Sequence, residues 1–197
     1  MIRTVFKLLL PLAILFVTSP ACAQSGAIKL PLSKPVSSLK FGVESPSPTL
    51  QMSGSFSKFN GTLLLDPQEV TNSKVNLSLD LRSAQLLPDQ IIQTIFLQTA
   101  IAHLKQPEST FISERIESLG GKRYLMHGVY TWQGKSKRTS VPVEIVSASP
   151  YRSEVRVHMS GQAKEGEPPK ELQKLGGLSA SGSKGWAKGT FIFTSNG

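Results

Sequence analysis

Few residues of this chain carry side chains that could do chemistry, and they are widely spaced. Three histidines, His103, His127 and His158, occur in no spacing that metal ligands use. The chain has one cysteine, Cys22, and it contains neither a Gly-x-Ser-x-Gly nucleophile turn nor a phosphate-binding loop. Its 13 acidic residues are scattered, and no pair is placed for acid–base catalysis. The sequence therefore predicts no catalytic residue and no metal site, and it favours a binding protein over an enzyme.

The first residues have the features of an export signal. Two basic residues flank the start of an apolar run over residues 8–17, and the small residues at 21–23 have the A-x-A form of a cleavage site. The run is shorter than the roughly 20 residues that span a bilayer. We therefore expect a signal peptide over residues 1–23, with cleavage near Ala23.

The rest of the chain, residues 24–197, is then expected to form a single domain in the periplasm or outside the cell. This length is sufficient for one buried core. Cys22 would leave with the signal, so the mature chain would have no cysteine and no disulfide. Lipidation of Cys22 is the alternative, although the sequence lacks a leucine three positions before it.

The charge of the chain is strongly positive, at +9. The basic residues are dispersed, and Lys135, Lys137 and Arg138 follow a predicted turn. A solvated basic surface is the simpler interpretation. The functional one is attraction to an anionic membrane surface or an envelope polymer. The chain shows no nucleic-acid-binding module, so we expect no nucleic-acid partner.

Alternation of apolar and polar residues predicts a fold made of β-strands. Residues 38–44 alternate cleanly, and similar alternation recurs along the chain between Gly- and Pro-containing turns. We expect strands over or near residues 50–56, 62–65, 74–82, 110–118, 124–132, 139–146, 155–159 and 186–194. The dipeptide Asn60-Gly61 is predicted to be a hairpin turn. Regular spacing of this kind favours an antiparallel sandwich or barrel.

One segment has a different period. Residues 88–104 are predicted to form a helix, with Pro88 in its first turn. Ile91 and Ile95 begin an apolar stripe, which Ile92 and Phe96 widen. The stripe is most simply a face packed on the barrel, and a ligand lid is the alternative.

Three passages, in this order, resemble a known family. The first combines Leu39-x-Phe41-x-Val43 with Gly54-x-Phe56-x-x-Phe59-x-Gly61, the second is Val75-x-Leu77-x-Leu79, and the third is Gly128-x-Tyr130-x-Trp132-x-Gly134. Together they resemble the YceI-like family of exported, lipocalin-like proteins associated with polyisoprenoid binding. The chain differs from the family at residues 86–104 and 161–184, in regions where ligand specificity would reside.

The resemblance implies an all-β fold, an antiparallel eight-stranded lipocalin-like barrel with one inserted α-helix at about residues 88–104. It also implies a bound isoprenoid lipid or quinone, or another long-chain amphiphile. The residues expected to bind it are Leu39, Phe41, Val43, Phe56, Leu63, Leu65, Leu77, Leu79, Tyr130, Trp132, Val141 and Val143, with Ile92 and Phe96 closing one end.

Two alternatives remain open. The same apolar residues could fill the barrel and leave no cavity. The chain could also be a non-catalytic envelope interaction or stress-related protein that binds a protein or an anionic polymer through its basic loops.

Overall fold

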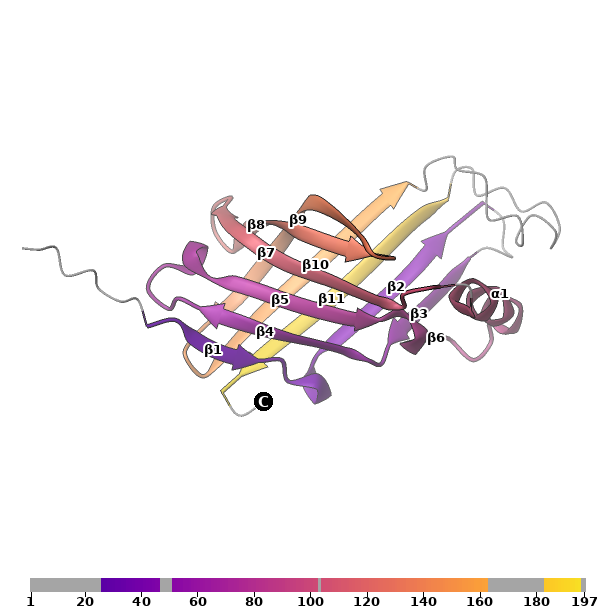
Figure 1. Ribbon diagram of the computed structural model, residues 1–197, viewed down its shortest axis with the longest axis horizontal. Coiled ribbons are helices and arrows are strands. Elements are labelled where there is room, and N and C mark those ends of the chain that lie inside the picture. Colours follow the sequence, from indigo (N-terminus) through magenta and orange to yellow (C-terminus); the bar gives the residue numbers. More distant parts are fainter. Residues whose placement is uncertain (1–25, 47–50, 103, 163–182, 196–197) are drawn as a thin grey trace, which may run out of the picture.

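The computed structural model describes residues 26–46, 51–102, 104–162 and 183–195. Within these ranges the chain forms antiparallel strands, one α-helix and short 3-10 helices (Figure 1). The strands are β1 (Ile28–Pro31), β2 (Ser38–Glu44), β3 (Met52–Phe56), β4 (Phe59–Leu65), β5 (Lys74–Asp80), β6 (Ala84–Leu86), β7 (Glu108–Ser118), β8 (Arg123–Trp132), β9 (Lys135–Ala148), β10 (Arg152–Gln162) and β11 (Lys184–Thr194). The helices are α1 (Ile91–Ala102), η1 (Lys34–Val36), η3 (Val70–Asn72) and η4 (Leu81–Ser83).

The strand pairs follow one another around a ring. Their order is β1-β4-β5-β7-β8-β9-β10-β11-β2-β3-β6. β3 leads into β4 through Ser57 and Lys58 alone, and β5 leads into β6 through η4. Backbone hydrogen bonds continue the pairing across these bends, from Ser57 N to Ser83 O at 3.2 Å and from Asp80 N to Lys58 O at 2.9 Å. The first three strands of the order, β1, β4 and β5, therefore continue along the chain into or from its last three, β2, β3 and β6, and the sheet curls into a barrel.

The number of strands, eleven in the described residues, exceeds the eight expected, because three runs of the barrel wall are each broken in two. Pro35 in η1 separates β1 from β2, since proline has no N–H to donate to a ladder. β1 pairs with β4, and the following residues continue along β11 through the bridge from Leu32 to Phe193. The all-β antiparallel class and the inserted helix are confirmed, and eight runs of chain, three of them interrupted, form the wall.

The predicted turn at Asn60-Gly61 is wrong. Both residues lie inside β4, and the chain bends before the strand, at Ser57-Lys58. A Cβ atom on Gly61 would lie 2.5 Å from the side chain of Leu77, so glycine is needed there for close approach between strands. Its φ angle is not in the positive region, which only Gly120, Gly121, Gly134 and Gln133 adopt among the described residues.

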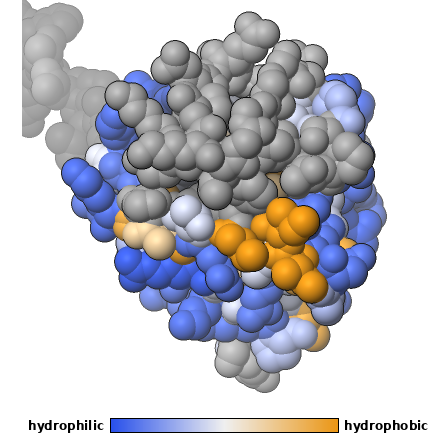
Figure 2. Space-filling model, turned by 90° about the vertical axis from the view of Figure 1, so that its right-hand side faces the viewer, coloured by the Kyte–Doolittle hydropathy of each residue, from blue (hydrophilic) through white to orange (hydrophobic). Residues whose placement is uncertain are grey.

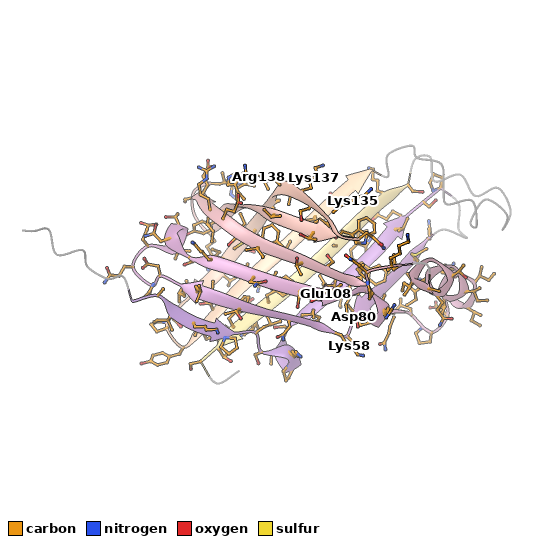
Figure 3. All side chains as sticks on the ribbon, viewed as in Figure 1. Lys58, Asp80, Glu108, Lys135, Lys137 and Arg138 are labelled. Atoms are coloured by element: carbon orange, nitrogen blue, oxygen red, sulfur yellow. The ribbon has the colours of Figure 1, made fainter. Side chains whose placement is uncertain are left out.

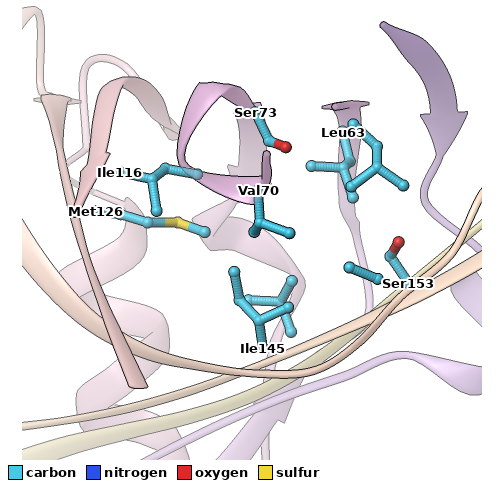
Figure 4. A pocket seen from close by; sticks show the side chains of 10 residues that line it. Leu63, Val70, Ser73, Ile116, Met126, Ile145 and Ser153 are labelled. Atoms are coloured by element: carbon cyan, nitrogen blue, oxygen red, sulfur yellow. The ribbon is translucent and has the colours of Figure 1, made fainter. Parts of the chain in front are cut away.

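One end of the barrel is filled by apolar side chains. Figure 4 shows Val70 of η3 pointing into a cluster that includes Leu63, Ile116, Met126 and Ile145. The remaining space is about 10 Å³, no more than a single water molecule needs. This packed cluster holds the strands together at the end opposite α1.

Helix α1 starts three residues later than predicted and ends two residues earlier. Its N-terminal side is tied to β3, because the backbone N–H of Ser53 donates to Oε1 of Gln90 at 3.1 Å and Leu87 N donates to Ser53 O at 3.3 Å. Figure 1 shows α1 beyond the ends of the barrel strands. The insertion therefore stands at one end of the barrel.

An apolar cavity at the open end of the barrel

A cavity of about 490 Å³ occupies the half of the barrel that the packed cluster leaves open. Met126 and Val155 border both the cavity and the packed cluster, so they form its floor. The interior of an eight-stranded barrel can be filled by its own side chains or can hold one small ligand. In this barrel, side chains fill one half and the cavity occupies the other. None of the described residues that line the cavity is charged.

The apolar lining comes from strands all around the barrel, because every second side chain of a barrel strand points inward. These side chains are Leu39, Phe56, Phe59, Val75, Leu77, Leu79, Leu81, Phe111, Met126, Val141, Val143, Val155, Val157, Met159, Ala187, Phe191 and Phe193. Tyr130 adds an aromatic ring with a hydroxyl group, and Ser109 and Thr139 add small hydroxyls. This surface suits an apolar chain.

Half of the residues predicted to bind ligand line this cavity. They are Leu39, Phe56, Leu77, Leu79, Tyr130, Val141 and Val143. Leu63 and Leu65 lie instead in the packed cluster at the other end. The residues that line the cavity and those in the packed cluster differ in their position along the barrel axis, although both groups lie on strands in which apolar and polar residues alternate.

The other predicted residues lie outside the cavity lining. Phe41 stacks against Phe56, with ring centroids 4.6 Å apart, and Val43 follows it along β2. Trp132 is half exposed at the end of β8, and Ile92 is exposed on α1. The side chain of Phe96 lies outside the described residues.

The prediction missed the contribution of β10 and β11. Val155, Val157 and Met159 line one wall, and Ala187 and Phe191 line the neighbouring one. The alternation of both strands is visible in the sequence, so the signal for these inward side chains was present. The sequence did not show how the strands close into a ring, which brings these side chains to the same cavity.

The apolar stripe of α1 is exposed, so the prediction that it packs on the barrel is wrong. Ile91 is 70% exposed, and Ile92 and Ile95 are each 58% exposed. Figure 2, which views the molecule from this end, shows apolar side chains gathered on the surface.

Two lysines stand at the rim of the cavity mouth. Lys137 pairs with Tyr130 across the β8–β9 ladder, and Lys135 pairs with Trp132. Both lie on the side of β9 that carries Val141 further along. Arg138 lies on the opposite side and forms an ion pair with Glu114 at 3.6 Å. Figure 3 shows these basic residues along β9, with Lys135 at the end near α1.

A second group of polar side chains lies on the outer wall. His127 Nδ1 is 2.8 Å from Ser140 Oγ, and His127 Nε2 is 3.2 Å from Glu117 Oε2. These are the residue types of a Ser-His-Glu triad. However, Met126 before His127 faces the interior, so the histidine faces outward, where backbone N–H groups are engaged in the ladder and no oxyanion-binding pair is formed. Arg115 also holds Glu117, at 3.2 Å, and the group is best explained as a surface polar network.

Metal binding finds no support in the described residues, which contain no group of three or more His, Cys, Asp or Glu side chains suited to an ion. His158 is exposed on β10, and His103 lies outside the described residues.

The fold and its cavity define an antiparallel β-barrel with an apolar interior and one open end. A model of the YceI-like domain matches residues 32–171, and the chain belongs to this family. No curated protein sequence matches the chain.

Two solved structures have the same fold. BcnA from Burkholderia cenocepacia has a TM-score of 0.63 and 17% identity, over 82% of this chain and 98% of that one. A polyisoprenoid binding domain from Saccharophagus degradans, implicated in plant cell wall breakdown, has a TM-score of 0.60 and 13% identity, over 85% of this chain and 98% of that one. In the described part of this chain, no helix has the length and apolar character required to cross a membrane.

Proposed function

We propose that this protein is a non-catalytic carrier in the periplasm or outside the cell, and that it holds an isoprenoid or another long-chain amphiphile in the barrel. The observation that carries the proposal is the cavity of about 490 Å³ with no charged side chain among its described lining residues. Its volume falls within the range of roughly 300–1,000 Å³ found for small-molecule sites. The similarity to a polyisoprenoid binding domain supports the proposal through the shared fold.

Binding in this site requires no chemical step. Moving the apolar chain of a ligand from water into the barrel contributes up to about 0.8 kcal/mol for each buried methylene group. The head group stays at the mouth, where water remains accessible. There Tyr130 offers a hydroxyl, and the ammonium groups of Lys135 and Lys137 favour an anionic head group.

The size of the cavity limits the length of chain that it encloses. An apolar cavity of about 150 Å³ is large enough for benzene, which has six carbons. On this scale the 490 Å³ cavity encloses roughly 20 carbons, or about four isoprene units. A longer chain would extend through the mouth.

Native mass spectrometry of the mature protein, purified without detergent from its own cell envelope, tests the proposal. We expect an adduct that is lost on denaturation and has the mass of a prenyl lipid, a quinone or a comparable amphiphile. The ligand-free protein should also take up added farnesol or a short-chain quinone. Protein that is isolated empty and takes up neither compound would refute the carrier function and favour binding through the surface.

A further inference from the structure

We propose that the exposed face of α1, together with the lysines beside it, is a docking surface for a lipid bilayer that contains anionic lipids. We call this set, consisting of Ile91, Ile92, Ile95, Lys105 and Lys135, the mouth face. The docking itself is argued from the surface alone. Its use, which is to pass a lipid between the bilayer and the cavity, rests on the function proposed above.

The composition of α1 is unusual for a helix on a water-exposed surface. Its twelve residues, IIQTIFLQTAIA, include no acidic and no basic side chain. The three isoleucines expose more than half of their surface, and Leu87 just before the helix is half exposed. A contiguous apolar patch of this kind marks an interaction site, because water-exposed apolar surface is unfavourable.

The attachment of α1 to the barrel leaves this face free. Its main contact within the described residues is with β6. The polar anchor to β3 uses Gln90 and Leu87, which precede the helix, and not the isoleucine side chains. The helix is therefore held in place by its N-terminal side while the isoleucines point into solvent, as an interfacial helix requires.

Basic residues lie at the other end of the helix. Lys105 follows α1 and is exposed, and the next residue, Gln106, reaches the β8–β9 turn, where its Oε1 would lie 2.8 Å from a Cβ placed on Gly134. Lys135 is the next residue along that turn. This contact brings the segment after α1 beside the basic start of β9, so apolar and basic groups share one face.

Charge identifies a bilayer as the occupant of this face. Of the net charge of +9, two charges belong to the expected signal peptide, so the mature chain carries +7, and a basic surface is drawn to the negative potential of anionic lipids. Acidic residues lie at the same end: Asp80 and Glu108 pair across β5 and β7 (Figure 3), and Asp89 precedes α1. We therefore expect moderate and salt-sensitive binding. A second copy of this chain would instead bring like charges together.

The mouth face lies at the same end of the barrel as the cavity opening, so docking would bring the opening to the membrane. Lys135 and Lys137 border the mouth from β9, and α1 stands at the same end of the barrel (Figures 1 and 3). Docked through this face, the protein presents the cavity opening to the bilayer. An apolar chain then enters the barrel without crossing bulk water.

Vesicle co-sedimentation of the mature protein tests docking. The vesicles are phosphatidylcholine alone or phosphatidylcholine with phosphatidylglycerol. We expect binding to the mixed vesicles, with at least a tenfold loss in partition coefficient for the variant Ile91→Ser/Ile92→Ser/Ile95→Ser. The control Ile112→Ser removes an isoleucine that is 50% exposed on β7, and it should change binding less than twofold.

A second pair of variants tests the charge. Lys105→Gln/Lys135→Gln should weaken binding to the mixed vesicles at least threefold. Lys74→Gln/Lys122→Gln removes the same charge at the packed end of the barrel and should have a smaller effect. Equal loss in both pairs would show that net charge, and not the mouth face, determines binding, and would overturn the proposal.

The remaining outcomes decide the occupant and separate the two proposals. Absence of binding to the mixed vesicles, or unchanged binding by the triple isoleucine variant, refutes docking. A dimer in light scattering that the triple variant converts to a monomer assigns the face to a second copy and also refutes it. Farnesol uptake, measured without vesicles, should be the same in the triple variant as in the wild type. If the wild type binds vesicles but takes up no farnesol, the carrier function is refuted and docking is not.

Discussion

The capacity of the cavity leads to a prediction about ligand length. Ala187 lines the cavity, and Gly185, its neighbour on the same side of β11, leaves open space beside it, since no atom lies within 4 Å of a Cβ placed there. The substitution Ala187→Phe adds a benzene-sized ring, equivalent to about 150 Å³ of apolar space. The 490 Å³ cavity would then be reduced by roughly a third, from room for about 20 carbons to room for about 14.

The expected effect is a change in how affinity depends on chain length. In the wild type, lengthening a prenyl alcohol from fifteen to twenty carbons should bury about five more carbons, each contributing at most about 0.8 kcal/mol. Allowing for incomplete burial, we expect a gain of about 2–4 kcal/mol, which is about thirtyfold or more in Kd. In Ala187→Phe the same lengthening should give almost no gain, because the added carbons lie outside the barrel.

Competition against a fluorescent prenyl probe gives Kd values for alcohols of ten, fifteen, twenty and longer chains. Ile112→Phe adds the same kind of ring on the outer wall and should retain the wild-type series. The reasoning is refuted if Ala187→Phe keeps the full gain in affinity between the alcohols of fifteen and twenty carbons. It also fails if the wild-type affinity continues to rise with the same slope far beyond twenty carbons.

Three substitutions test what holds the barrel together, each measured by urea unfolding. Leu65→Ala empties a site that is 1% exposed in the packed cluster and should cost about 2–5 kcal/mol of unfolding free energy; a loss below 1 kcal/mol would contradict the packing described. Ser113→Ala removes the Oγ atom that accepts the N–H of Val75 at 2.7 Å and should cost about 1–3 kcal/mol, with faster hydrogen exchange at that amide; unchanged exchange would show that another acceptor serves it. Gly54→Ala places a Cβ 2.2 Å from the backbone oxygen of Gln85 and should lower the unfolding midpoint by disturbing the β3–β6 pair, whereas a wild-type midpoint would place the two strands further apart.

Most strands of the barrel wall could be predicted from the sequence, whereas the short β1 and β6 could not. Each wall strand has one side toward the interior and one toward solvent, so alternation marks it clearly. The strand expected over residues 38–44 has those bounds in the structure, and the strand expected over residues 110–118 extends two residues further at its start. Gly120 and Gly121 lie in the turn between β7 and β8, where both adopt positive φ, as a Gly-Gly dipeptide favours.

The axial position of each inward side chain could not be read from local pattern. Leu63 and Leu65 alternate as Leu77 and Leu79 do, yet the first pair lies in the packed cluster and the second lines the cavity. The difference arises from the stagger of neighbouring strands around the ring, which depends on pairings between distant residues.

Two other misjudgements have a similar origin. Asn60-Gly61 has the composition of a turn, but the glycine serves the close approach of β4 to β5. The apolar stripe of α1 indicates burial, yet Ile91 and Ile95 are exposed. In both cases the local sequence pattern was recognised correctly, but the tertiary structure gives these residues a different role from the one that the pattern indicates.

The separation of the packed cluster from the cavity has an evolutionary consequence. Tightly packed side chains such as Leu65 and Ile116 lie at one end, and α1 and the lysines that border the mouth lie at the other (Figures 1 and 3). Mutations at the mouth can therefore accumulate and change ligand preference without bringing the protein below its stability threshold. A barrel divided in this way is an evolvable scaffold, and two solved structures share its architecture at identities of 13–17%.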